Sequence, residues 1–122
     1  MDAQVILKRF ERPDEVREFP KGRFEIVRLG GMTIGRATYE PGWHWAKDVG
    51  KAMGEPFCRV EHVGLVVSGC ATAEMEGGKS VEMREGDLFH VPAHPHDSRV
   101  LGEEPYVSLH FLGADDYAES EG

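Results

Sequence analysis

The sequence has few of the features that would place it outside the class of small soluble domains. It contains only two cysteines, Cys58 and Cys70, which excludes a disulfide framework and, without a secretory signal, predicts reduced thiols. No apolar run approaches the ~20 residues that a membrane span needs. The N-terminus, with Lys8, Arg9 and Glu11, lacks the apolar segment of a signal peptide. We therefore expect a cytoplasmic protein with no membrane partner.

Basic residues are also in the minority. The chain has 14 Lys and Arg against 22 Asp and Glu, a formal net charge of -8, which argues against nucleic acid as a partner. Three catalytic motifs are absent: a phosphate-binding glycine loop, the Gly-x-Ser-x-Gly elbow and a Cys-x-x-Cys pair. With 122 residues, 40% of them hydrophobic, the chain can bury one core but is too short for two domains.

Turn residues at short intervals divide the chain into β-type segments, and no segment has the period of a helix of ordinary length. Short strands at this spacing indicate an all-β sandwich or barrel. Strands are predicted at 24–29, 32–39, 70–75, 80–83, 88–91, 97–101 and 106–112. Beside a barrel at 21–113, we expect residues 1–20 to form an N-terminal arm or edge strand and residues 114–122 to form a frayed acidic tail.

Two motifs in the middle of the chain provide the main functional clue. In the first, His62 begins an apolar run that ends seven positions later at Gly69. In the second, Gly86 and Asp87 form a tight turn into a strand that ends at Pro92. A turn at 76–79 separates the two motifs. Together they predict neighbouring hairpins of a small β-barrel with a metal-capable residue in its mouth.

The segment 58–96 resembles the two-motif signature of the cupins, which are small β-barrels of jelly-roll type. The first cupin motif is His-x-His, a Glu four residues later, and a Gly after six more residues. The second is Gly-Asp, a Pro six residues after that Gly, and a His. Gly69, Gly86, Asp87 and Pro92 match these motifs, and His96 is displaced by one residue from the terminal His. The resemblance implies an all-β, single-domain cupin-type jelly-roll barrel.

The ligand positions of the first cupin motif hold different residues in this chain. His62 stands at the position of the Glu, Cys58 at that of the second His, and Pro56 at that of the first His. A typical cupin site offers three histidines and a carboxylate, whereas this chain would offer imidazoles and a thiolate. Nitrogen and sulfur ligands favour zinc or iron(II), so the resemblance implies a divalent metal of this kind. The candidate metal ligands are His62, His96, His44 and Cys58.

Strand alternation supports an inward orientation for two of these candidates. One face of the predicted strand holds Cys58, Val60, His62, Gly64 and Val66. This face is smaller and less charged than the opposite one, which suits a barrel interior. The thiol and the imidazole would then point in together. Cys58 keeps a second interpretation, because a buried free cysteine often acts as a small hydrophobic residue.

Three further histidines follow the first motif. His94 competes with His96 as the inward residue of a corner that prolines make rigid. His90 lies in the middle of a predicted strand and is interpreted as a packed or surface residue. His110 shares a strand face with Tyr106, so it either lines the same cavity or simply packs in the core.

Trp43, His44 and Trp45 form an unusual cluster after a Pro-Gly turn. On an extended segment the two indoles share one face and His44 occupies the other. If His44 points in, it completes a site with His62 and His96. If the indoles point in, they form an aromatic wall for an organic ligand or fill the core. The following residues 46–57 show no clear periodicity and are predicted to be a flap over the barrel mouth.

These observations lead to a hypothesis of a small cupin-like protein that binds a divalent metal in the barrel mouth and a small organic ligand beside it. The residues assigned to ligand binding are Trp43, Trp45, His94 and His110. As an enzyme the protein would resemble metal-dependent cupin oxygenases or isomerases, although no motif selects a reaction. The alternative is a metal-free module that binds or senses a small molecule without catalysis. Because cupins commonly dimerise through sheet edges, the resemblance and the arm also predict a homodimer.

Overall fold

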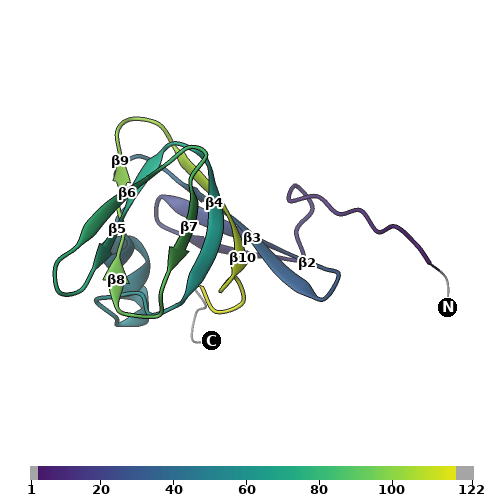
Figure 1. Cartoon of the computed structure of the whole chain (residues 1–122), viewed down its shortest axis with the longest axis horizontal. Coiled ribbons are helices and arrows are strands. Elements are labelled where there is room, and N and C mark those ends of the chain that lie inside the picture. Colours follow the sequence, from purple (N-terminus) through teal and green to yellow (C-terminus); the bar gives the residue numbers. More distant parts are fainter. Residues whose placement is uncertain (1–2, 118–122) are drawn as a thin grey trace.

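The computed structural model describes residues 3–117 and consists mainly of β-strands (Figure 1). The strands are β1 (Glu15–Phe19), β2 (Gly22–Leu29), β3 (Met32–Tyr39), β4 (His62–Ser68), β5 (Cys70–Met75), β6 (Ser80–Arg84), β7 (Leu88–Val91), β8 (His96–Asp97), β9 (Val100–Leu101) and β10 (Tyr106–Leu112). Two helical turns, η1 (Ala46–Gly50) and α1 (Lys51–Met53), lie between β3 and β4. The all-β class predicted from the turn spacing is confirmed.

The strands form two antiparallel sheets around one core. The first sheet has six strands in the order β1-β2-β3-β10-β4-β7, and the second has the order β6-β5-β8 with β9 also paired to β5. The chain crosses between the sheets, because β4 and β7 belong to the first and β5 and β6 to the second (Figure 1). This arrangement leaves β7 at one edge of the first sheet and β6 at one edge of the second.

The β2–β3 hairpin shows how the turn residues set the register. Leu29 pairs with Met32, so the turn contains only Gly30 and Gly31. Both glycines have positive φ, 58° and 77°. Two consecutive residues with positive φ match the twist of antiparallel strands, and glycine adopts this conformation without a steric penalty.

Alternating side chains from the first sheet fill the core. Phe24 and Ile26 on β2 are fully buried, and Val66 on β4 is 1% exposed. Gly64 lets β4 approach β10 closely, because a Cβ atom there would lie 2.1 Å from the carbonyl oxygen of Leu109. Gly64 therefore takes up little space on the inward face of β4. This leaves room for the larger rings of neighbouring strands.

The segment 46–57, predicted to be a flap without periodicity, begins with eight helical residues. The five residues of η1 are followed by the three of α1, and Gly54 ends α1 with φ of 74°. Asp48 and Val49 are buried, so this part of the segment packs against the barrel. No helix of ordinary length was expected, and none occurs in residues 3–117. Neither helical turn in this range has the length or hydropathy of a membrane span.

The ends of the barrel differ in detail from the predicted boundaries. Within the predicted arm, β1 pairs with β2 as an edge strand of the first sheet. At the other end, Ala114 and Tyr117 were assigned to the tail, but both are buried, at 1% and 3% exposed. Residues 118–122 lie outside the described residues. The strand predicted at 97–101 is divided into β8 and β9, and Arg99 between them pairs with His44.

Candidate metal centre

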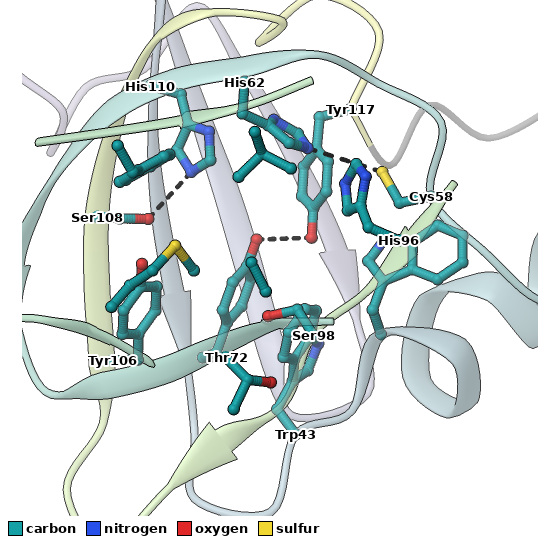
Figure 2. A pocket seen from close by; sticks show the side chains of 16 residues that line it. Trp43, Cys58, His62, Thr72, His96, Ser98, Tyr106, Ser108, His110 and Tyr117 are labelled. Carbon is teal, nitrogen blue, oxygen red and sulfur yellow. Dashed lines mark hydrogen bonds between the residues drawn. The ribbon is translucent and has the colours of Figure 1, made fainter. Parts of the chain in front are cut away.

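A small cavity lies between the two sheets and is lined by 16 residues, of which Figure 2 labels ten. It offers about 50 Å³ to the centres of water-sized molecules. No Lys, Arg, Asp or Glu of the described chain lines it. The wall instead contains three imidazoles, one thiol, several aromatic rings and the hydroxyl groups of serine and threonine. A neutral, largely apolar lining is typical of a small-molecule site with a few directed polar groups.

Cys58, His62 and His96 meet at one end of this cavity (Figure 2). One ligand atom from each residue lies within 4.8 Å of the others, and all three residues are buried. The Sγ atom of Cys58 is 3.7 Å from Nε2 of His62. The ring centroids of His62 and His96 are 5.5 Å apart. The structure therefore brings together three of the four residues that the sequence nominated as metal ligands.

Backbone pairing positions these three side chains. The N–H of Cys58 donates to the carbonyl of His96 at 2.7 Å, and the N–H of His96 donates back at 2.9 Å. This bridge holds the segment before β4 against β8. His62 is the first residue of β4, four residues after Cys58, and it points to the same side. The predicted alternation of side chains agrees with the structure, because the side chains of both Cys58 and His62 enter the cavity.

A backbone contact leaves one nitrogen of His96 free to bind. Its Nδ1 lies 2.8 Å from the carbonyl oxygen of His94, so Nδ1 carries the proton and donates it. Nε2 then has a bare lone pair, and this buried atom has no hydrogen-bond partner among residues 3–117. Metal-ligating histidines are commonly oriented by such a bond from the other ring nitrogen. The unpartnered nitrogen of His96 is the clearest sign that a ligand belongs here.

His110 is the third imidazole of the cavity. Its ring centroid lies 5.2 Å from that of His62, and its Nε2 lies 3.0 Å from Oγ of Ser108. Nδ1 of His110 is buried and has no hydrogen-bond partner in the part of the chain that the structure describes. The sequence left open whether His110 lines the cavity or packs in the core, and the structure places it on the cavity wall.

Burial keeps the ionisable groups of the site neutral. Burial, together with the charges that His110 and His96 would carry, holds the pKa of His62 well below its usual range. Burial also lowers the pKa of His96, although the carbonyl of His94 opposes this effect. It raises the pKa of the Cys58 thiol to about 11. At neutral pH the imidazoles are therefore in the form that binds metals, whereas the thiol keeps its proton until an ion displaces it.

The neutral state of His110 predicts acid sensitivity of the metal-free protein. Burial lowers its pKa to about 4, whereas in the unfolded chain it titrates near the ordinary value of about 6.5. Between these pH values the unfolded chain binds more protons, so stability is complete above the higher value and is lost as the pH falls toward the lower one. From this residue alone, we expect the free energy of unfolding to drop by about 2 kcal/mol between pH 7 and pH 5.

Urea denaturation at several pH values measures this drop. His110→Gln should make the pH dependence less steep, with the lowered pKa values of His62 and His96 still contributing to it. His90→Gln, which changes an exposed histidine, should leave the profile as in the wild type. An equally steep profile for His110→Gln would contradict the assignment.

Aromatic side chains form the other end of the cavity. Trp43 stacks on Tyr39 with ring centroids 3.8 Å apart and an angle of 4° between the rings. The Tyr39 and Tyr117 hydroxyls are 2.6 Å apart and hydrogen-bonded (Figure 2). The Nε1 atoms of Trp43 and Trp45 are buried, and none of the described residues accepts a hydrogen bond from them. This end therefore offers flat apolar surface together with unused N–H donors.

The structure resolves the alternatives for the Trp43 to Trp45 cluster. Both indoles line the cavity and His44 lies on the opposite side, where its Nε2 contacts Oδ2 of Asp97 at 2.5 Å. His44 therefore does not join the three-residue metal group found within residues 3–117, and this candidate ligand is corrected. The physical reason is that two large apolar rings gain more from burial than one imidazole.

Two other histidines also point away from the cavity. His94 is exposed and its Nε2 donates to the carbonyl of Glu76 at 3.0 Å, so its assignment to ligand binding is corrected. Of the two histidines in the rigid corner, His96 is the inward one. His90 is exposed and contacts Glu61, as a surface histidine would.

Sequence reasoning missed two tyrosines that line the cavity, Tyr39 and Tyr117. Tyr39 could have been found by alternation along β3, because Gly35 and Ala37 share its inward face. Tyr117 follows two aspartates near the end of the chain. No local pattern distinguishes it from a tail residue.

Comparison with known proteins supports the fold. No protein-family model matches the sequence, and no curated protein matches it either. Among solved structures, an uncharacterized conserved protein with a double-stranded β-helix domain from Klebsiella pneumoniae subsp. pneumoniae MGH 78578 is similar. It shares 15% sequence identity, with 93% of each chain covered and a TM-score of 0.60.

Two named proteins are similar at the same level. KdgF from Halomonas sp. shares 18% identity over 91% of this chain and 94% of that chain, with a TM-score of 0.59. Oxalate decarboxylase from Lactobacillus farciminis, solved as a formate complex, shares 17% identity over 81% of this chain, with a TM-score of 0.56. This chain spans only 30% of that enzyme. With its two crossing sheets and these neighbours, the chain has the cupin fold, the double-stranded β-helix.

Proposed function

We propose that this protein binds one divalent metal ion through Cys58, His62 and His96, and acts on a small organic molecule held in the same cavity. The observation that supports this most strongly is the buried, unpartnered Nε2 of His96, which lies in one group with a thiol and a second imidazole. A buried polar atom without a partner is unfavourable by about 1–3 kcal/mol. A bound ion would satisfy it.

The distance between the donor atoms of Cys58 and His62 fits a tetrahedral ion. Zinc binds sulfur at about 2.3 Å and nitrogen at about 2.1 Å, which separates the two donors by about 3.6 Å. The Sγ–Nε2 distance between Cys58 and His62 is 3.7 Å. Because the donors are nitrogen and sulfur, zinc is the preferred ion and iron(II) the second choice. Three protein ligands would leave a fourth position for water or substrate.

A bound ion would supply Lewis acidity to a substrate oxygen. The chain's own residues would bind and orient the ligand. The stacked rings of Trp43 and Tyr39 provide a flat surface for the ligand, and the free indole N–H groups can donate to its oxygen atoms. The paired phenols of Tyr39 and Tyr117 stay protonated, because burial raises the pKa of both, so either can donate a hydrogen bond.

The lining favours a small and uncharged substrate. Since no charged side chain of residues 3–117 lines the cavity, a carboxylate would find no cationic side chain of this range to pair with. A redox-inactive zinc ion suits an isomerase, whereas iron(II) would suit an oxygenase. We therefore propose an isomerase-type reaction on a neutral carbonyl or hydroxyl compound if the ion is zinc. If the ion is iron(II), we propose an oxygenase reaction instead.

The alternative function is a metal-free module that binds or senses a small molecule. The high pKa of Cys58 supports this alternative, because a protonated thiol is a poor metal ligand. In that case the imidazoles would serve only as hydrogen-bonding groups for the ligand.

Metal analysis after gentle purification tests the two functions against each other. We expect close to one equivalent of zinc or iron in the wild type, and a loss of metal in His96→Ala. His90→Ala is the matched control, because it removes an exposed histidine whose ring contacts Glu61 and does not line the cavity, and it should keep its metal. Less than about a tenth of an equivalent in the wild type, also after incubation with zinc, would favour the metal-free module.

A further inference from the structure

The cavity of the candidate metal centre is small and enclosed. Its volume is about 50 Å³, whereas sites for small organic molecules usually have about 300–1,000 Å³. Cys58, His62 and His96 are only 4%, 6% and 4% exposed. An ion or an organic ligand can therefore reach these side chains only if part of the protein moves aside.

The segment that covers the cavity on one side consists of residues 113–117, called the strap below. It follows β10 directly and forms turns instead of a strand. At its start, Gly113 lies against the backbone carbonyl of Glu61, just before β4. At its end, the ring of Tyr117 packs against Phe24 on β2, with ring centroids 4.9 Å apart. The strap therefore crosses the inner side of the first sheet, from β4 toward β1.

Tyr117 is the strap residue that fills space beside the metal group. Its ring centroid lies 5.2 Å from that of His62 and 6.0 Å from that of His110. Figure 2 shows the ring beside the His62 imidazole. Its hydroxyl is hydrogen-bonded to that of Tyr39, deep in the cavity. If Tyr117 moves outward, the cavity gains the volume of a phenol ring and the metal group becomes accessible to solvent.

One arginine holds the strap to the edge of the sheet. Nη1 of Arg17, on β1, donates to the carbonyl oxygens of Ala114 and Tyr117 at 3.2 and 2.7 Å. The Arg17 side chain is 12% exposed, and its Nε donates to Glu15 at 2.7 Å, which orients the guanidinium. Hydrogen bonds from a charged donor are stronger than neutral ones. Loss of Arg17 would therefore weaken the strap at two points at once.

The start of the strap has the geometry of a hinge. Gly113 has a φ of 91°, which residues with a side chain rarely adopt. The N–H groups of Asp116 and Tyr117 both donate to the carbonyl of Gly113, at 3.2 and 3.1 Å. The turn is thus closed on itself. It can swing about Gly113 without breaking these bonds or the pairing of β10, as hinged loops do in other proteins.

We propose that the strap opens and closes the cavity, with Gly113 as its hinge, Tyr117 as the side chain that closes the site and Arg17 as the residue that holds the closed state. A turn held by side-chain contacts opens at a lower free energy than a strand paired on both sides. The open state admits the ion and enlarges the cavity for the small organic molecule, and this role rests on the proposed function.

Labelling of the Cys58 thiol tests the strap in the absence of metal. In a Cys70→Ser parent chain Cys58 is the only thiol. The chain is freed of metal with a chelator, exposed to N-ethylmaleimide at constant pH and followed by mass spectrometry. We expect labelling through local opening, so its rate should hardly change with urea below the unfolding transition. A rate that rises with urea as steeply as global unfolding overturns the proposal.

Variants of two arginines assign the opening to the strap. Arg17→Ala should speed labelling about tenfold or more, which corresponds to about 1.4 kcal/mol, because a charged donor to two carbonyls is lost. Arg17→Lys keeps a charged donor and should lie between this variant and the parent chain. Arg23→Ala is the matched control, because it removes an exposed arginine of the same sheet that pairs with Glu25, and it should label at the parent rate.

Urea denaturation of each variant corrects the labelling rates for changes in global stability. After this correction, an unchanged rate in Arg17→Ala, or an equal increase in Arg23→Ala, overturns the proposal.

Zinc separates this inference from the proposed function. If the ion binds through Cys58, labelling of the parent chain should slow roughly a hundredfold at a free zinc concentration of about 100 times the Kd. Equally fast labelling in saturating zinc would contradict metal binding through Cys58. The metal-free rates would still decide whether the strap opens, so the two proposals can fail separately.

Discussion

Adding zinc to the metal-free protein is expected to raise its thermal unfolding midpoint by roughly 10 °C or more. An ion that binds only the folded state stabilises it by about 4 kcal/mol when its free concentration is a thousand times the Kd. The three donor atoms come from separate parts of the fold, Cys58 before β4, His62 within β4 and His96 in β8. The unfolded chain cannot hold them together, so almost all of the binding free energy should appear as stability.

Differential scanning fluorimetry with and without zinc measures this shift. His62→Ala and His96→Ala should remove most of it, because loss of a ligand weakens affinity by at least about 100-fold and so leaves about 1.4 kcal/mol of the stabilisation or less at the same zinc concentration. Cys58→Ser should keep part of the shift, since an oxygen replaces the sulfur. His90→Ala should behave as the wild type. A full shift in His96→Ala would show that zinc binds elsewhere.

Trp43→Ala is expected to lower the free energy of unfolding by about 3–5 kcal/mol. The indole is 1% exposed and stacks on Tyr39, and its centroid lies 6.4 Å from that of Phe19. Its removal would leave a hole between the two sheets next to an already existing cavity. Partial collapse around this hole would not recover the lost ring contacts.

Urea denaturation followed by circular dichroism gives this free energy. Trp43→Phe should lose much less, because a phenyl ring can still stack on Tyr39. Met32→Ala, at a half-exposed position of the β2–β3 turn, should change stability by less than about 0.5 kcal/mol. A loss below about 1 kcal/mol for Trp43→Ala would contradict the central role of the stack.

The barrel and the inward face of β4 could be predicted because both depend on short-range rules. Turn residues divide the chain into strands, and alternation along a strand decides which side chains share a face. This reasoning placed Cys58 and His62 on one inward face, and the rigid corner before His96 placed that imidazole near the second motif. The structure brings these three residues into one group.

The same rules could not decide which of two opposite faces of a strand points into the core when both faces carry partly apolar side chains. Alternation requires that His44 and the two indoles point to opposite sides, but it does not say which side is the core. Only the packed barrel shows that the indoles fill the interior and that Asp97 holds His44 outside. The choice between His94 and His96 was open for the same reason.

By itself, the sequence determined the all-β class, the spacing of the hairpins and the common side to which the Cys58 thiol and the His62 imidazole point. The tertiary structure decided which groups complete the cavity: His110 from β10, Tyr39 from β3 and Tyr117 from beyond the last strand. Tyr39 lies far from His110 and Tyr117 in the chain, and the pairing of β10 between β3 and β4 brings them together. Local patterns specify faces and turns, whereas contacts between distant strands depend on how the whole core packs.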